Sequence, residues 1–307
     1  MFIFLLSLMI NGIVCLICHK YHLLMDIPNQ RSSHVSPIPR CGGIVIVLSF
    51  IGTLFYYGYT GPIAGIVMLS IISLWDDLKS IHPLPRLLFH FMAVLIGYVQ
   101  IFGWEHHVYT LPLIVFCVWI INLYNFMDGI NGIAASEGIC VLGALYVLSN
   151  HQTTIYLPLT LCLFGYLPWN FPKSKMIMGD IGSCNIGYIF SYILMTFAKE
   201  QSHLFWITCL LLGLFLCDAT ITLFHRMMRK QAFWKAHREH SYQVLTRQFK
   251  SHTCVTSTII LANISIVFPL AYWLYYHFSW SNFTITLLGV GALCLLPKLL
   301  YKDQIYK

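Results

Sequence analysis

Charged side chains are scarce in this chain: Asp, Glu, Lys and Arg make up only 9% of its 307 residues. Soluble domains typically carry about 25% of these residues. The shortage excludes an ordinary soluble domain. Hydrophobic residues reach 58%, the mean hydropathy is +0.73, and apolar segments of roughly spanning length recur from end to end. Together these features indicate an integral membrane protein.

The chain also lacks Gly/Ser linkers, low-complexity tracts and internal repeats. We therefore expect one domain, residues 1–307, with an all-α fold, because unpaired backbone cannot face lipid. The first apolar stretch has no basic leading segment and no small-residue cleavage site, so we interpret it as a retained span. Most of the eleven cysteines lie in apolar segments, Cys15 and Cys18 included, and we expect buried free thiols.

The apolar segments predict about eleven spanning helices. They cover approximately residues 2–18, 42–59, 62–75, 87–103, 110–124, 132–149, 154–168, 184–198, 203–224, 254–278 and 283–299. One alternate set of connections holds every Lys and Arg except Lys199, if Lys298 is counted with the final tail. The positive-inside rule places this set in the cytoplasm, the amino terminus in the periplasm and the carboxyl terminus in the cytoplasm. The net charge of +7 is thus a topology signal, and we expect no nucleic acid as a partner.

The first cytoplasmic connection, residues 19–41, contains several prolines and runs into Gly42 and Gly43. Prolines disfavour a helix, and glycines allow a close backbone approach. Arg31, His34 and Arg40 could grip a phosphate. A basic loop beside lipid headgroups explains the same residues equally well.

The second connection, residues 76–86, begins with Asp76 and Asp77 and ends with Arg86. Two adjacent carboxylates at the carboxyl end of a helix meet the negative end of its dipole and repel each other. A divalent metal, or a base poised to accept a proton, would offset this cost. Solvated helix ends are the alternative.

Polar residues are concentrated in the third and fourth connections, approximately 122–134 and 169–184. These residues are Asn122, Asn125, Asp128 and Asn131 in the third, and Asn170, Gly179 and Asp180 in the fourth. Polar groups at a membrane edge usually serve a site, although an ordinary polar hairpin would also fit. The sequence Gly-Asp-x-Gly-Ser begins a helix, whose free N–H groups suit a phosphate, and Asp180 suits Mg²⁺.

The fifth connection, residues 225–253, is the longest and most basic, and it places His237, Arg238 and His240 within one helical turn. Imidazoles and a guanidinium could contact a nucleotide or a sugar. A zinc site would need further ligands of matching spacing, and a solvated helix is the other alternative. Acidic and basic segments thus meet on one membrane face, which fits chemistry on a phosphorylated lipid better than a transporter with its site at the midplane.

In order along the chain, the motifs are D-x-P-N-x-R…H-x-x-P-x-P-R-x-G-G, D-D, N-x-x-N-F-M-D-G-I-N-G, G-D-x-G-S and A-H-R-x-H-x-Y-Q. This set resembles the polyprenyl-phosphate N-acetylhexosamine-1-phosphate transferases, and its last motif is most similar to the branch that starts O-antigen and related polysaccharides. The related phospho-N-acetylmuramoyl-pentapeptide transferases of peptidoglycan synthesis remain an alternative within the family. A membrane transporter or lipid-binding protein is the alternative from another class.

The resemblance implies transfer of N-acetylhexosamine-1-phosphate from a UDP-sugar to undecaprenyl phosphate in the bacterial inner membrane, with release of UMP at the cytoplasmic face. It implies Mg²⁺, with Mn²⁺ as a substitute, and suggests a homodimer. By position, Asp180 and Asn125 would hold the metal, and Asp76, Asp77 and Asp128 would be catalytic, with Asp76 the candidate base. The implied substrate contacts are Arg40, Arg86, Asn122, Asn131, Asn170, Gly179, His237, Arg238 and His240. Ile177 stands where many members carry an aromatic residue suited to stacking on uracil.

Overall fold

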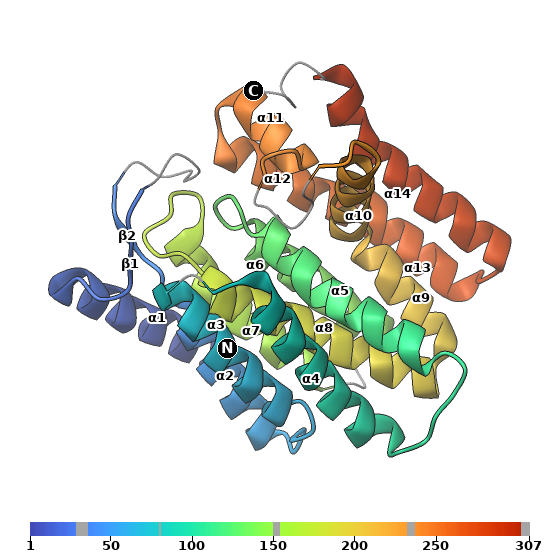
Figure 1. Cartoon of the computed structure of the whole chain (residues 1–307), viewed down its shortest axis with the longest axis horizontal. Coiled ribbons are helices and arrows are strands. Elements are labelled where there is room, and N and C mark those ends of the chain that lie inside the picture. Colours follow the sequence, from blue (N-terminus) through green and yellow to red (C-terminus); the bar gives the residue numbers. More distant parts are fainter. Residues whose placement is uncertain (29–35, 80, 150–153, 232–236, 302–307) are drawn as a thin grey trace.

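The computed structural model describes residues 1–28, 36–79, 81–149, 154–231 and 237–301. Arg31 and His34, considered above as phosphate ligands, lie outside these ranges. The first half of the chain forms α1 (Phe2–Tyr21), β1 (Met25–Asp26), β2 (Ile38–Pro39), α2 (Gly42–Tyr56), α3 (Ile63–Lys79), α4 (Pro83–Phe102), α5 (Thr110–Met127) and α6 (Ile133–Leu148). The second half forms α7 (Tyr156–Asn170), α8 (Gly179–Glu200), α9 (Ser202–Leu211), α10 (Gly213–Met228), α11 (Ser241–Phe249), α12 (His252–Ala262), a π-helical turn (Asn263–Val267), α13 (Phe268–Tyr276) and α14 (Trp280–Leu300). The expected helical bundle is therefore confirmed (Figure 1).

The expected number of spans is met only in part. Six helices of the described chain are long and apolar enough to cross a membrane, and a seventh span results if α9 and α10 are counted together. These two helices were predicted as one span, residues 203–224, but they meet at an angle of 72°. The helices α2, α3, α6 and α7 have only 15 to 17 residues. Eleven crossings and the orientation of the termini thus stay predictions.

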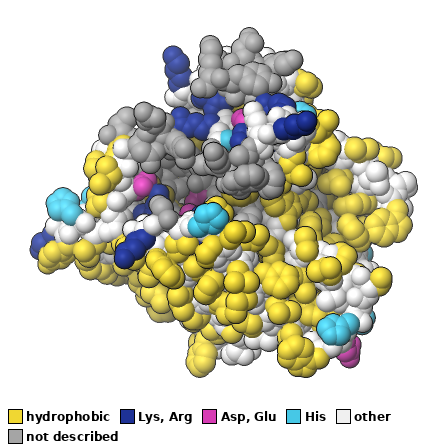
Figure 2. Space-filling view, viewed as in Figure 1, with side chains coloured by type: hydrophobic (Ala, Val, Ile, Leu, Met, Phe, Trp, Pro, Cys, Tyr) yellow, Lys and Arg dark blue, Asp and Glu magenta, His cyan; other side chains and the backbone are white. Residues whose placement is uncertain are grey.

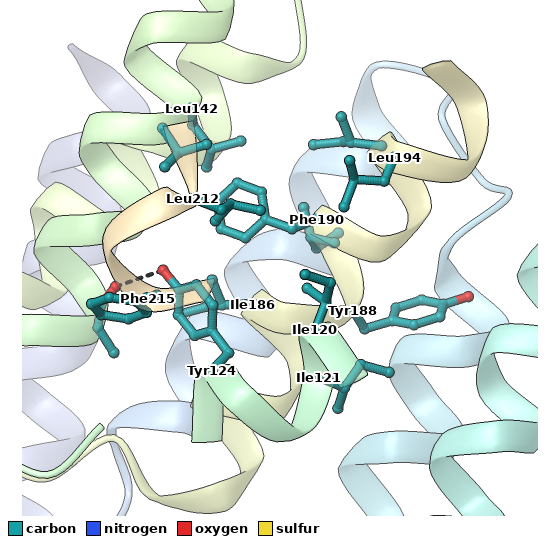
Figure 3. Close-up of a cluster of buried hydrophobic side chains, with 14 of the residues drawn as sticks. Ile120, Ile121, Tyr124, Leu142, Ile186, Tyr188, Phe190, Leu194, Leu212 and Phe215 are labelled. Carbon is teal, nitrogen blue, oxygen red and sulfur yellow. Dashed lines mark hydrogen bonds between the residues drawn. The ribbon is translucent and has the colours of Figure 1, made fainter. Parts of the chain in front are cut away.

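Helix α8 is the centre of the bundle, and most of its residues are buried. It packs against α5 along its length and also contacts α2, α3, α4 and α9. Small residues in its first half allow these close approaches. Figure 3 shows the core formed where α5, α6 and α8 meet the α9–α10 bend. Tyr124 is buried in this core and donates a hydrogen bond of 2.9 Å to the carbonyl of Ala134.

The outside of the bundle is largely apolar. Hydrophobic side chains cover much of the face shown in Figure 2, whereas Lys and Arg gather toward its upper part, near α11 and the short β1–β2 pair. The strands β1 and β2 pair in antiparallel fashion within the first connection. The eleven cysteines, all within the described residues, are free thiols, as expected.

Candidate active site

Arg86 links two of the predicted acidic motifs. Its side chain comes from the first turn of α4 and forms an ion pair with Asp76, near the end of α3. The second guanidinium nitrogen lies 3.3 Å from Oδ2 of Asp180, in the first turn of α8. Asp76 also accepts a hydrogen bond of 2.6 Å from the backbone N–H of Ile81. The structure therefore brings together two carboxylates that are about one hundred positions apart in the chain.

Arg40 forms a second link beside the first. Its guanidinium donates to Asp77 at 3.0 Å and to Asp26 at 2.8 Å. The Asp77 carboxylate also accepts the backbone N–H groups of Asp180 and Ile181, at 3.2 and 3.4 Å. These are N–H groups at the amino end of α8, which we had predicted to be free for a phosphate. That prediction is wrong for these two N–H groups, because Asp77 already caps them.

Gly179 is required at the start of α8 for geometric reasons. Its φ is +71°, in the left-handed region that side chains rarely adopt. A Cβ atom there would lie 2.7 Å from Cγ of Arg40 and 2.8 Å from Oδ2 of Asp77. The absence of a side chain thus lets Arg40 and Asp77 pack directly onto the helix end.

The first connection is attached to the segment before α8 by backbone hydrogen bonds. Gly42 and Gly43 donate to the carbonyls of Ile177 and Met178 at 3.1 and 2.9 Å, and Ile177 donates to Pro39 at 2.8 Å. A Cβ atom on Gly43 would lie only 2.3 Å from the backbone nitrogen of Gly182. The close approach expected of the Gly-Gly pair is therefore confirmed, and it holds Arg40 next to α8.

Asn125 reaches the same helix from α5. Its amide nitrogen donates to Oγ of Ser183 at 3.2 Å, three residues after Asp180. Asn122, one turn earlier, donates to the carbonyl of Val118 in its own helix and lies near the ring of His90. His90 was missed in the sequence, although it lies one turn after Arg86 on the same face of an apolar helix. A polar pair at that spacing within an apolar span is the signal that could have found it.

Asp128 follows the last residue of α5 and is close enough to Asp180 and Asp77 to interact electrostatically with them. Burial, and then the negative charge of Asp180, raises the pKa of Asp128 to about 7. The same two causes raise the pKa of Asp77 to about 7, against the opposing effect of Arg40. Burial also raises the pKa of Asp76. We call Asp26, Asp76, Asp77, Asp128 and Asp180 the carboxylate cluster.

The donor chemistry of this cluster fits Mg²⁺, which prefers hard oxygen ligands. Among the residues just described, four of the five carboxylates pair with the guanidinium groups of Arg40 and Arg86, and Asp128 is the fifth. Negative charge is therefore in excess. Within the described parts of the chain, no three His, Cys, Asp or Glu side chains already surround a single point as metal ligands do. Asp180 has 24% of its side chain exposed, against 2% for Asp77, so it is more accessible to a cation.

Two predicted substrate residues connect loops to one another. Asn170 is 6% exposed, accepts the N–H of Gly132 and donates to the carbonyl of Met176 at 2.8 Å. Asn131 donates to the carbonyl of Pro172 at 3.1 Å and contacts His252 on α12. Both residues therefore position the third and fourth connections, and a substrate contact by either stays a prediction.

The fifth connection is anchored to the third by Tyr242. Its hydroxyl donates to the carbonyl of Phe126 at 3.0 Å. The rings of His237 and His240 lie 4.8 Å apart, and burial lowers the pKa of both to about 4. The two imidazoles are thus neutral at pH 7. Among the three substrate contacts predicted in this connection, only the exposed Arg238 can offer a full positive charge to a diphosphate.

Two further acids, Asp218 and Glu137, lie inside the apolar part of the bundle and have partners within the protein. Asp218 lies 2.8 Å from the ammonium of Lys298 and accepts the N–H and hydroxyl of Ser241 at the start of α11. Lys298 had been counted with the cytoplasmic tail, yet it is only 6% exposed. Glu137 accepts a hydrogen bond of 2.6 Å from Asn263. Asp218 thus holds α10, α11 and α14 together.

Comparison with known proteins agrees with this arrangement. The model of glycosyl transferase family 4 matches residues 59–198, which include Asp76, Asp77, Arg86, Asp128 and Asp180. Over these residues the chain is similar to glycosyl transferase family 4.

Several curated members of the family are similar to most of the chain. A probable undecaprenyl-phosphate N-acetylglucosaminyl 1-phosphate transferase of Bacillus subtilis is 25% identical, over 80% of this chain and 76% of its own length. The undecaprenyl-phosphate alpha-N-acetylglucosaminyl 1-phosphate transferase of Thermotoga maritima is 24% identical, over 86% of each chain. A phospho-N-acetylmuramoyl-pentapeptide-transferase of Dictyoglomus thermophilum is also 24% identical, over 79% of this chain and 86% of its own. The similarity to these proteins therefore extends over most of the chain, whereas the two kinds of relative differ in what their names say they transfer.

Proposed function

We propose that this protein transfers N-acetylhexosamine-1-phosphate from a UDP-sugar to undecaprenyl phosphate, with release of UMP. The product is undecaprenyl-diphosphate-N-acetylhexosamine, the first lipid-linked intermediate of O-antigen or a related envelope polysaccharide. The observation that carries the proposal is the carboxylate cluster with its two arginines, assembled from segments spread between Asp26 and Asp180. We place this site at the cytoplasmic face of the bacterial inner membrane, in a protein that forms a homodimer.

The proposed reaction forms one P–O bond and breaks another. An oxygen of the lipid phosphate attacks the phosphorus that bears the sugar, and the oxygen joining it to UMP leaves with the electron pair. Such transfers depend mainly on positioning and on stabilisation of charge. A phosphate monoester has its second pKa near about 6, so at pH 7 it is already a good nucleophile. Direct attack therefore needs no proton acceptor, and we favour it over an aspartyl-phosphate intermediate.

The arginines would position the phosphates. Arg86 and Arg40 are each held by two carboxylates, which fixes the planar fork that matches phosphate geometry. Asp76 orients Arg86 and, with a raised pKa, is also the candidate to take a proton from a lipid phosphate that arrives protonated. Asp180 and Asn125 would hold Mg²⁺, which when bound supplies positive charge to the diphosphate. Asp77 positions the end of α8, and Asp128 adds negative charge beside it.

Transfer can be tested in membranes containing the full-length protein, with labelled UDP-N-acetylglucosamine, undecaprenyl phosphate and Mg²⁺. We expect label in the lipid fraction and one UMP released per sugar phosphate transferred. Asp180→Ala and Asp76→Asn should each remove most of the signal. Glu105→Gln, at an exposed carboxylate between α4 and α5, should not. Full activity in both Asp variants would refute the site, and no UMP release with any sugar donor would favour the transporter alternative.

A second candidate is the peptidoglycan reaction, because a phospho-N-acetylmuramoyl-pentapeptide-transferase is similar over 79% of the chain. The same assay separates the two with a panel of donors. UDP-N-acetylglucosamine, UDP-N-acetylgalactosamine, UDP-N-acetylfucosamine and UDP-N-acetylquinovosamine represent the proposed function, and the UDP-muramyl pentapeptide represents the alternative. Use of the muramyl donor alone would decide for the peptidoglycan reaction.

A further inference from the structure

A cavity of about 600 Å³ lies at the end of the bundle opposite the carboxylate cluster. Its position follows from the direction of the helices. Helix α3 begins directly after Pro62, which lines the cavity, and Asp76 lies near its other end. Helix α8 carries Asp180 in its first turn and ends at Glu200, which also lines the cavity. The cavity is therefore separated from the site of the proposed reaction by the length of these helices.

The lining of this cavity combines aromatic rings with one carboxylate. Four tyrosines line it, namely Tyr59, Tyr156, Tyr192 and Tyr275. Glu200 is the only charged residue among the described lining residues, and it is near enough to interact electrostatically with Tyr156 and Tyr192. Gln100, Gln201, Ser149 and Thr196 add hydrogen-bonding groups, and the rest of the wall is apolar.

The adjacent positive charge is directed elsewhere. Lys199 precedes Glu200 in the chain but does not line the cavity. Its ammonium is bound by the carbonyl of Ile101 and lies 5.8 Å from the centre of the Phe102 ring. The described lining thus carries net negative charge, which disfavours a phosphate or another anion.

We propose that this cavity binds an organic ammonium group. Aromatic faces attract ammonium cations, and a carboxylate at the rim adds a complementary charge. The size of the cavity leaves room for an apolar body beside the cation. Tyrosines at helix ends are also common at the level of lipid headgroups. The ammonium can therefore come from an ethanolamine headgroup of a membrane lipid or from a soluble amine.

The test uses the full-length protein in lipid nanodiscs and three probes. Tetramethylammonium chloride reports ammonium binding through the unfolding temperature, with sodium chloride of equal ionic strength as the reference. N-acetylglucosamine serves as a neutral polar probe. Native mass spectrometry compares retention of phosphatidylethanolamine with that of phosphatidylglycerol. We expect tetramethylammonium to stabilise the wild-type protein and the neutral sugar to leave it unchanged.

The variant combines Glu200→Gln with Tyr59→Leu, both at exposed side chains, so folding should be retained. Losing the charge and one ring should weaken ammonium binding about tenfold. The matched control combines Glu105→Gln with Tyr56→Leu, which lie outside this cavity. UMP release and the unfolding temperature without probe should be unchanged in both.

Loss of the tetramethylammonium effect in the variant but not in the control supports the proposal. Selective retention of phosphatidylethanolamine then assigns the lipid as the source, and its absence assigns a soluble amine. Equal stabilisation of variant and control by tetramethylammonium would overturn the proposal. Equal effects of N-acetylglucosamine, or equal retention of phosphatidylglycerol, would also overturn it.

Discussion

Replacing Gly43 with alanine tests whether the α2–α8 contact positions the active site. The added Cβ would lie 2.3 Å from the nitrogen of Gly182, 2.5 Å from the carbonyl oxygen of Met178 and 2.9 Å from Cα of Gly182. All three are backbone atoms, so a side-chain rotation cannot relieve the contact. Because ordinary contacts of a Cβ atom begin near 3.4 Å, the two helices must separate by about 1 Å.

The expected cost follows from that separation. Overpacking of this kind typically costs about 1–3 kcal/mol. The hydrogen bonds from Gly42 and Gly43 to the segment before α8 would also weaken, at about 1 kcal/mol each. A total of about 3–5 kcal/mol corresponds to a fall of roughly 10 °C in the unfolding temperature. UMP release should fall about a hundredfold, because Asp180 and Arg40 move apart and a displacement of about 1 Å can have that effect.

The unfolding temperature and the rate of UMP release are measured on the same purified samples. Gly143→Ala is the matched control, because a Cβ atom on Gly143 in α6 meets nothing within 4 Å. Alanine is the better helix former by about 1 kcal/mol, so this variant should be as stable as the wild-type protein or more so. If Gly43→Ala behaved like Gly143→Ala in both assays, the inferred role of this contact in positioning the site would be wrong.

Three further predictions concern the cluster and its surroundings. The pKa of Asp128 is raised to about 7 in the folded protein, from an ordinary value near 3.8. The contribution of Asp128 to stability is therefore greatest below about pH 4 and is lost as pH rises through 7. Thermal unfolding in the presence of a chelator should show this loss between pH 5 and pH 8, and the loss should be smaller in Asp128→Asn. Arg86→Gln should lower the rate of UMP release about a hundredfold. Mn²⁺ binding should be kept or strengthened in this variant, because the Arg86 guanidinium competes with a cation for Asp180. Loss of Mn²⁺ binding would contradict this prediction. Tyr242→Phe removes the hydrogen bond to the carbonyl of Phe126, which should lower the free energy of unfolding by about 1 kcal/mol. The same variant should raise KM for the UDP-sugar. An unchanged KM would show that Tyr242 does not affect binding of the substrate.

The sequence was sufficient to predict the helical membrane architecture and the segments that meet at the site, because those depend on local patterns. Apolar runs predict helices, and acidic residues at helix ends indicate positions where a nearby positive charge or a metal ion must balance the negative charge. Arg86 and Asp180 were both candidates before the structure placed them 3.3 Å apart. Motif order alone implied that they belong to one site.

The remaining details depend on packing between distant segments. No local pattern shows that Asp77 caps α8, because this requires α3 and α8 to lie side by side. The bend between α9 and α10 was missed because residues 203–224 are mostly apolar and contain no proline at the break. Neutral His237 and His240 were also unpredictable, since their low pKa comes chiefly from burial.

Equilibrium binding of Mn²⁺ to the purified protein tests most directly whether the carboxylate cluster is a metal site. Electron paramagnetic resonance of free Mn²⁺ gives the stoichiometry without any need for substrate. We predict one Mn²⁺ per chain at pH 8, displaced by Mg²⁺, and at least tenfold weaker binding in Asp180→Asn than in Glu105→Gln. Absence of bound Mn²⁺, or equal binding in the two variants, would contradict the assignment.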